Sequence, residues 1–173
     1  EVIFKDIDSK LYYVSYLFAD GSGKSITVAT TRPETILGDV AICVNPADER
    51  YKDFVGKEVM VPIINRRIPI IADEYVAADF GTGALKITPA HDKNDNILGA
   101  KHGLKAIDTL DISGKFTTEE LVADDPSAHV LAYNGMDRFA LRKKIAADIT
   151  ALEQLEKTED YKSQVGTSER TGA

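Results

Sequence analysis

Short apolar runs bounded by glycine, proline or polar turn residues constrain the fold of this chain more than any other feature of the sequence. Val and Ile are frequent in them, which is typical of strands. The run at 10–18 and a second run are separated by the glycine-containing segment 19–24, a pattern that predicts a β-hairpin. The short runs that follow residue 18 are 25–30, 39–44, 58–64, 67–72 and 84–88.

Three segments carry helix signals instead. A helix is predicted over 47–55, because an Asn-Pro pair precedes it and Gly56 follows it. A second is predicted over 92–102, stopped by Gly103. The clearest is predicted within 137–155, where apolar residues recur at helical spacing on one face. These residues are Leu141, Ile145, Ile149 and Leu152. The region between the last two helices, 111–134, is predicted to be rich in loops.

The pattern predicts one α+β domain in which mostly antiparallel strands close a β-barrel core with helices around it. A length of 173 residues suits a single domain. No apolar run approaches the roughly 18 residues that cross a bilayer, so no membrane partner is expected. Cys43 has no possible disulfide partner in the chain and is expected to be a small buried residue, which fits a reducing, cytoplasmic compartment.

The net charge argues against a broad nucleic-acid-binding face. It is −7 at pH 7, whereas domains that bind nucleic acid over a large surface are usually basic. Any such contact is therefore expected to be local. The basic run 142–144 on the last helix is the best local candidate for phosphate contact, although such a run is more often a solvated helix face.

Two polar stretches interrupt the strand pattern. The first, TTRPETILGD at 30–39, follows the strand 25–30, where a simple surface reversal is the ordinary explanation. The second, 79–95, places Lys86 inside a strand pattern and brings a threonine, a histidine and two aspartates close after it. Alone, Lys86 would be expected to face outward. The pair His91-Asp92 equally suits a helix N-terminus. Asp92 and Asp95, three residues apart, could face one cavity.

Other chemistries fit the sequence poorly. The three histidines are His91, His102 and His129, and none lies upstream to complete a His-Asp metal site, so no metal is expected. No serine lies in a Gly-x-Ser-x-Gly turn, and Cys43 lies in an apolar strand. The GSGK segment, 21–24, lacks the flanking strand and helix of a P-loop and is expected to be a hairpin turn.

Taken together, the two stretches resemble the editing domain, also called connective peptide 1, of the class I aminoacyl-tRNA synthetases for valine, isoleucine and leucine. TTRPET followed by GTG, PAH and a later Asp carries the resemblance. Lys86 within KITPAHD, with the segments VNPADERY, RIPIIADEYV and NGMDRFALRKKI, is most similar to the valyl branch. The resemblance extends from Leu11 to Ala173. It implies a single editing domain over 1–173, with connectors at about 1–9 and 162–173 to a synthetic domain.

The resemblance implies an activity. Threonine and valine are nearly isosteric, so an apolar synthetic pocket rejects the added hydroxyl by only about 10², a problem that serves as a standard example of editing. The implied activity is hydrolysis of the ester in threonine-charged tRNA(Val), with the tRNA acceptor end and the synthetic domain as partners. The HIGH and KMSKS signatures of the synthetic domain are absent. No cofactor is therefore implied here, and ATP and Mg²⁺ belong to the synthetic domain.

The resemblance also assigns roles to residues of this chain. Asp95 would bind the α-ammonium of the amino acid. Lys86, Thr88 and Asp92 would read the threonine hydroxyl, Phe80 would form an apolar wall, and His91 would contact the adenosine or cap the helix. The residues near the ester and the terminal adenosine would be Thr30, Thr31, Arg32 and Thr35. The catalytic set is thus Thr31, Arg32, Lys86, Asp92 and Asp95, with water as the nucleophile and no covalent intermediate.

Three alternatives stay open at this point. An isoleucyl editing domain would clear valine from tRNA(Ile). A non-catalytic module would use the same fold to hold tRNA or a protein. A different hydrolase would act on a small metabolite.

Overall fold

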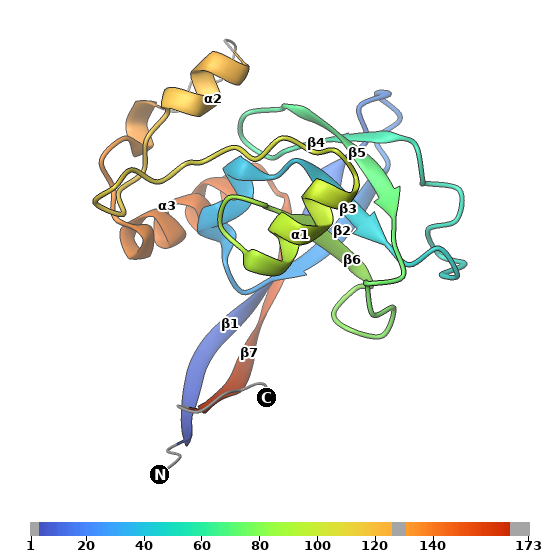
Figure 1. Cartoon of the computed structure of the whole chain (residues 1–173), viewed down its shortest axis with the longest axis horizontal. Helices are drawn as coiled ribbons and strands as arrows, with labels where there is room; N and C mark the ends of the chain where they lie inside the picture. Colours follow the sequence, from blue (N-terminus) through green and yellow to red (C-terminus); the bar gives the residue numbers. More distant parts are fainter. Residues whose placement is uncertain (1–3, 126–130, 167–173) are drawn as a thin grey trace.

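The computed structural model describes residues 4–125 and 131–166, and its strands form two separate sheets (Figure 1). The three-stranded sheet has the order β2-β1-β7, with strands Ser25–Thr30, Phe4–Leu17 and Leu155–Gly166. The four-stranded sheet has the order β4-β5-β3-β6, with strands Glu58–Met60, Arg67–Ala72, Ala41–Val44 and Ala84–Ile87. The α+β class and the mostly antiparallel pairing are confirmed. The pair β3 and β5 is parallel.

The expected closed barrel is wrong. One isolated bridge, Phe18 to Val59, joins the two sheets at one edge of the described structure. At the other edge β2 and β6 pack together without a shared ladder, and the Thr82 hydroxyl donates to the Thr27 carbonyl across the seam at 2.5 Å. Side chains rather than backbone hydrogen bonds fill this seam, so the sheets stay separate there. The functional residues lie along the same seam.

The predicted hairpin is confirmed, but β1 is longer than expected. Tyr12 pairs with Thr30 and Leu17 with Ser25, in antiparallel register. Towards its start, β1 pairs instead with β7, from Phe4 opposite Gly166. Figure 1 shows β1 and β7 leaving the body side by side. Residues 4–9 and 162–166, which belong to the expected connector segments, are therefore paired with each other. The sequence of 155–166 gave no strand signal.

Helix α1, Lys93–Lys101, and helix α3, Arg138–Ala151, confirm two of the predicted helices. Each begins after an aspartate whose carboxylate accepts backbone N–H groups of the first turn, Asp92 for α1 and Asp137 for α3. The apolar face of α3 is buried at its three predicted helical positions. Leu152 follows the helix as its C-cap and is 50% exposed, so its predicted place on the buried face is wrong.

The helix predicted over 47–55 does not form. The segment is a succession of turns, because Asn45 and Asp48 accept from the backbone N–H groups of Ala47 and Arg50, respectively. Such local bonds compete with helical ones. Conversely, the predicted loop region contains α2, Glu119–Asp124, and the short 3-10 helix η2, Leu131–Tyr133. His129 lies outside the described residues.

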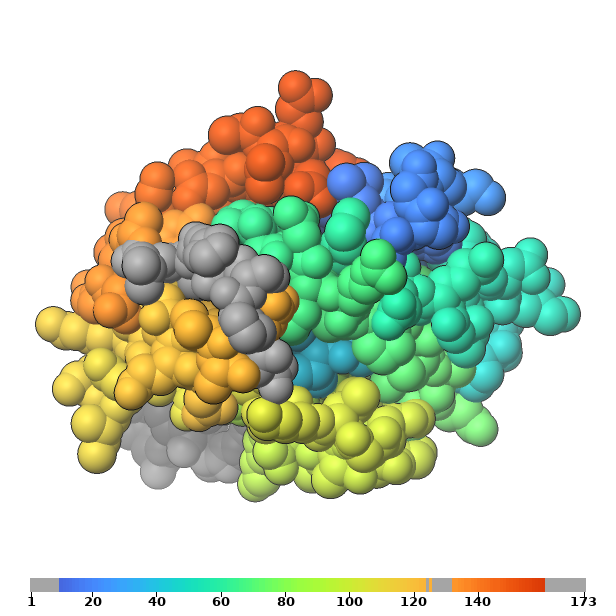
Figure 2. Space-filling view, turned by 90° about the horizontal axis from the view of Figure 1, so that it is seen from above, coloured from blue at the N-terminus to red at the C-terminus, as the bar shows by residue number. Residues whose placement is uncertain are grey.

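The core lies between the sheets and the helices that cover them. Cys43 is fully buried there as expected, and burial raises the pKa of its thiol to about 12. The 3-10 helix η1, Pro33–Gly38, is buried along its whole length and packs on α3. Figure 2 shows α1 and α3 at opposite margins of one face. In the described part of the chain, no helix is long and apolar enough to cross a membrane.

Candidate functional site

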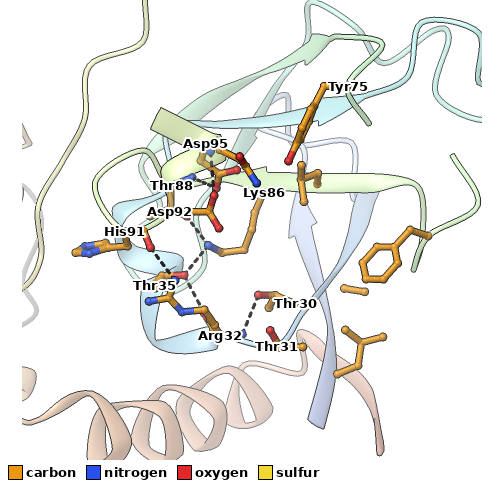
Figure 3. A pocket seen from close by; sticks show the side chains of 15 residues that line it. Thr30, Thr31, Arg32, Thr35, Tyr75, Lys86, Thr88, His91, Asp92 and Asp95 are labelled. Atoms are coloured by element: carbon orange, nitrogen blue, oxygen red, sulfur yellow. Dashed lines mark hydrogen bonds between the residues drawn. The ribbon is translucent and has the colours of Figure 1, made fainter. Parts of the chain in front are cut away.

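A cavity of about 240 Å³ opens along the seam between β2 and β6 (Figure 3). Its walls come from the end of β2 and η1 on one side, and from β6 and the start of α1 on the other. Every residue that the sequence predicted for the site lines this cavity. They are Thr30, Thr31, Arg32, Thr35, Phe80, Lys86, Thr88, His91, Asp92 and Asp95. The two polar stretches, far apart in sequence, therefore face one space.

The first stretch is shaped by its own hydroxyl groups. The Thr30 hydroxyl accepts from the Arg32 backbone N–H at 3.0 Å, and the Thr35 hydroxyl donates to the Arg32 carbonyl at 2.8 Å. Arg32 also donates from Nη1 to the carbonyl of His91 at 2.7 Å, which ties this stretch to the second one. The arginine side chain is 39% exposed at the cavity. Thr31 makes no hydrogen bond with its side chain among the described residues.

Glu34 anchors this wall from behind. Its side chain is 3% exposed, and it accepts a two-pronged hydrogen bond from Arg142 of α3, Nε to Oε1 at 2.8 Å and Nη2 to Oε2 at 2.9 Å. The geometry is that of a bidentate arginine-carboxylate pair. Arg142 is therefore engaged inside the domain, and Lys144 pairs with Asp148 on the same helix. The expectation that the run 142–144 serves phosphate contact finds no support from these two side chains.

Lys86 lies at the centre of the cavity floor. It is 6% exposed, so the outward orientation expected of an isolated strand lysine does not apply. Its Nζ lies 2.7 Å from Asp39 Oδ1, 2.8 Å from the Thr35 hydroxyl and 2.5 Å from the Thr88 hydroxyl. The buried charge is thus paired and fully hydrogen-bonded, as a buried ammonium requires.

Asp39 is the residue of the site that sequence reasoning missed. It is fully buried, and besides Lys86 it accepts from the Tyr16 hydroxyl at 2.5 Å and the Thr88 hydroxyl at 2.7 Å. Arg66 donates to its backbone carbonyl. Burial raises the pKa of Asp39, and Lys86 opposes that shift. The available signal was an acid directly before an apolar strand, at the end of the first polar stretch.

Asp95 presents a carboxylate without a cation. It is 8% exposed, its Oδ2 accepts from the Thr88 backbone N–H at 2.9 Å, and no ion pair involves it in the described structure. Burial is the main cause that raises its pKa to about 6. The group is therefore ionised at neutral pH and available to a positively charged ligand.

Asp92 and His91 have structural partners. Asp92 caps α1, accepting from the Asp95 backbone N–H at 3.0 Å, and it is exposed at the cavity mouth. The His91 ring points away from Lys86 in Figure 3, and its Nε2 lies 2.9 Å from the Thr109 hydroxyl. The Thr109 backbone N–H donates to the same nitrogen at 3.2 Å, and burial lowers the pKa of His91. The resemblance left two roles open for His91, contact with the adenosine or capping of the helix. In the structure its ring contacts Thr109 and its carbonyl accepts from Arg32.

The rim of the cavity is aromatic. Phe80 and Tyr75 are about half exposed, at 50% and 53%, and both also line an adjoining, mostly apolar hollow of about 340 Å³. Tyr75 comes from the loop after β5, within the RIPIIADEYV segment that carries part of the resemblance, but sequence reasoning assigned it no role in the site. Within the described residues, no group of three or more metal-ligating side chains is arranged to hold a metal ion.

Comparison with known proteins defines the class. Residues 45–150 match the family described as leucyl-tRNA synthetase, editing domain, so the chain belongs to the aminoacyl-tRNA synthetase editing-domain family. Within it, the chain resembles the valine–tRNA ligases. It is 50% identical over 173 residues to that of Bacillus subtilis (strain 168), and 50% identical over 171 residues to that of Porphyromonas gingivalis. These matches cover 100% and 99% of the chain but only 18% of each relative.

A solved structure supports the fold. A LeuRS of Agrobacterium radiobacter K84, solved as a ternary complex with tRNA and LeuAMS, matches with a TM-score of 0.61 at 21% identity. The match covers 94% of this chain and 20% of that one. At this identity the likeness is one of fold alone.

Proposed function

We propose that this chain hydrolyses the ester bond of threonine misattached to tRNA(Val), as the editing domain of a valyl-tRNA synthetase. The observation that carries the proposal is the cavity itself, where the unpaired carboxylate of Asp95 and the hydrogen-bonded floor around Lys86 face one space. A threonyl ester presents a free α-ammonium and a side-chain hydroxyl, and these are groups that a buried carboxylate and a polar floor can bind. The similarity to valine–tRNA ligases supports the same reading.

Asp95 is the proposed anchor for the α-ammonium. Among the residues that the structure describes, its carboxylate has one donor, the Thr88 backbone N–H, and no cation that a ligand would displace. A charge-assisted contact in a site with 8% exposure is stronger than the same contact in water. Because an amino acid inside a peptide lacks this ammonium, the contact selects a free aminoacyl group.

The opposite wall is proposed to hold the ester and the terminal ribose. The Thr31 hydroxyl has no partner in the part of the chain that the structure describes, and Arg32 is partly exposed beside it. A water held between these groups and the ester would attack the carbonyl carbon. The bond from that carbon to the ribose oxygen would break, the ribose oxygen would take up the proton that the water loses, and the neighbouring ribose hydroxyl would assist its departure by a hydrogen bond. Catalysis then consists of positioning and electrostatic stabilisation. No covalent enzyme intermediate forms.

The terminal adenosine and the rest of the tRNA are proposed partners. The aromatic rim of Tyr75 and Phe80 borders the cavity where the nucleoside would enter. The net charge of −7 fits a local contact with the acceptor end rather than a broad one. The synthetic domain of the same protein is the second proposed partner.

Deacylation assays test the proposal. Threonine-charged tRNA(Val) is expected to be hydrolysed faster than valine-charged tRNA(Val) or valine-charged tRNA(Ile). Preference for valine-charged tRNA(Ile) would assign the domain to the isoleucyl branch. Binding of tRNA without hydrolysis would favour a non-catalytic module, and hydrolysis of simple esters alone would favour a different hydrolase.

A further inference from the structure

Two segments far apart from the cavity floor meet at the carboxyl end of strand β3. Strands β3 and β5 are parallel, with Val44 opposite Ala72, so the segments that follow them leave the sheet at the same edge. Strand β6 lies on the other side of β3, with Val44 opposite Ala84. The loop 73–83, which connects β5 to β6, must therefore cross the end of β3, where the turn segment 45–51 begins.

The loop 73–83, here called the rim loop, carries the two aromatic side chains at the cavity mouth, Tyr75 and Phe80. It also forms much of the wall of the adjoining hollow. The loop contains no helix or strand and is shaped by turns. The Phe80 backbone N–H donates to the Ala77 carbonyl at 3.2 Å, and the Gly83 N–H donates to the Phe80 carbonyl at 2.9 Å. Its place relative to the sheets therefore depends on contacts with other segments.

Three side chains of the segment 45–51 hold the rim loop by its backbone. Each donates a hydrogen bond to a different carbonyl of the loop. The bonds run from Asn45 Nδ2 to Val76 at 2.9 Å, from Arg50 Nη2 to Ala78 at 2.7 Å, and from the Tyr51 hydroxyl to Thr82 at 2.5 Å. None of these three side chains lines the cavity or the adjoining hollow. Any influence that they have on a ligand must therefore pass through the rim loop.

Arg50 is itself held in place. Its Nε and Nη2 donate to the two carboxylate oxygens of Asp48, at 3.0 and 2.7 Å, so the guanidinium is oriented as it reaches the Ala78 carbonyl. Gly83 packs against this pair. It has a φ of +80°, and a Cβ there would collide with Arg50 Nη2 and lie 3.0 Å from Asp48 Oδ2. The end of the rim loop thus fits closely against the ion pair, with no room for a side chain between them.

Resting on the proposed function, we propose that Asn45, Arg50 and Tyr51 are positioning residues for binding of the nucleoside that carries the aminoacyl group. They act through the rim loop, by holding Tyr75 and Phe80 at the mouth of the cavity. Aromatic side chains offer stacking surfaces to bases, and a surface that is already in its bound arrangement costs less to use. The ester lies against the opposite wall, of β2 and η1. Loss of these contacts therefore weakens substrate binding rather than the hydrolytic step.

Tyr51→Phe isolates one of the three contacts. It removes the hydroxyl that donates to Thr82 and keeps the ring, which lies against Phe54. KM for threonine-charged tRNA(Val) is expected to rise roughly fivefold while kcat changes by less than about twofold, as for a lost interaction common to ground state and transition state. Tyr13→Phe is the matched control, because the Tyr13 hydroxyl donates to Glu159 of strand β7 and does not line the cavity.

A double-mutant cycle shows whether the effect passes through the rim loop. In a Phe80→Ala background the main stacking surface is gone, so adding Tyr51→Phe is expected to raise KM further by less than about twofold. A residue that merely supported the fold would have the same effect in both backgrounds, because its role would not depend on Phe80. Arg50→Leu replaces Tyr51→Phe in the cycle if the latter gives no cooperative thermal melt, since the Arg50 side chain is 55% exposed.

The outcomes separate this inference from the proposed function. An unchanged KM in the folded variant, a fall in kcat in place of the rise in KM, or equal effects in the two backgrounds overturns the inference and leaves the proposed function intact. A wild-type chain that does not hydrolyse threonine-charged tRNA(Val) overturns the proposed function and this inference with it.

Discussion

At the scale of single residues, Asp95 is buried and has no counter-ion among the described residues. Asp95→Ala is expected to lower kcat/KM for threonine-charged tRNA(Val) by roughly ten- to a hundredfold or more, because a charge-assisted contact of about 1.5 to 3 kcal/mol is lost. Asp95→Asn is the matched control, since an amide oxygen can still accept from the Thr88 N–H. Both variants should keep a cooperative thermal melt. Hydrolysis near the wild-type rate by folded Asp95→Ala would contradict the assigned role.

The raised pKa of Asp95, about 6, gives a pH dependence. Binding of the α-ammonium needs the carboxylate, so kcat/KM is expected to rise as pH increases through about 6 and then level off, provided that no later step masks it. The free energy of unfolding changes with pH in the opposite direction. The pKa of an aspartate in the unfolded chain is about 3.9, and that of Asp95 in the folded chain is higher. Asp95 therefore contributes its full stabilisation of the fold below a pH of about 3.9, and this contribution is lost as the pH rises through about 6. Denaturant titrations should therefore show wild type losing stability relative to Asp95→Asn between these limits.

Replacing Lys86 with an apolar residue is expected to destabilise the fold. Lys86→Leu leaves Asp39 buried without its cation, at a cost in unfolding free energy of roughly 3 to 5 kcal/mol. Adding Asp39→Asn should recover part of that loss, which a double-mutant cycle measures. In any folded Lys86→Leu protein, hydrolysis of threonine-charged tRNA is expected to fall roughly tenfold while the valine-charged tRNA changes less. An equal fall for both would assign Lys86 to the common ester or adenosine.

At the scale of elements, the position of η1 depends on α3. The wall that carries Thr31 and Thr35 is attached to α3 through the Glu34–Arg142 pair. Arg142→Ala should destabilise the domain by about 2 kcal/mol, below the value for a fully buried pair because Arg142 is 29% exposed. Editing should weaken as well. Lys143→Ala, an exposed neighbour on the same helix, is the control. Equal melts for the two variants would mean that the pair does not hold η1.

At the scale of the whole molecule, the site is assembled from residues of both sheets, of the 3-10 helix η1 and of helix α1. We expect editing to be independent of metal, because the ester is reactive and positioned water suffices. Chelation followed by dialysis should leave the deacylation rate of threonine-charged tRNA unchanged. Loss of activity that zinc restores would favour a metallohydrolase instead.

The sequence alone determined much of the local structure and named the residues of the two polar stretches that line the cavity. Hydrophobic periodicity, helix-capping residues and turn residues are read from residues close together in the sequence. The hairpin of β1 and β2, helix α1 and the buried face of α3 could therefore be predicted. The motif residues of the cavity could be named from their resemblance to a family.

Tertiary structure decided what depends on distant residues. The pairing of β7 with β1, the parallel β3–β5 pair and the open seam in place of a closed barrel come from contacts between segments far apart in the sequence. Burial of Lys86 likewise depends on Asp39, which belongs to another element. A lysine ammonium can be buried only where a counter-charge and hydrogen-bond acceptors compensate for its loss of water. No local pattern encodes that contact, so the sequence placed Asp39 at the end of the first polar stretch but only the folded chain paired it with Lys86.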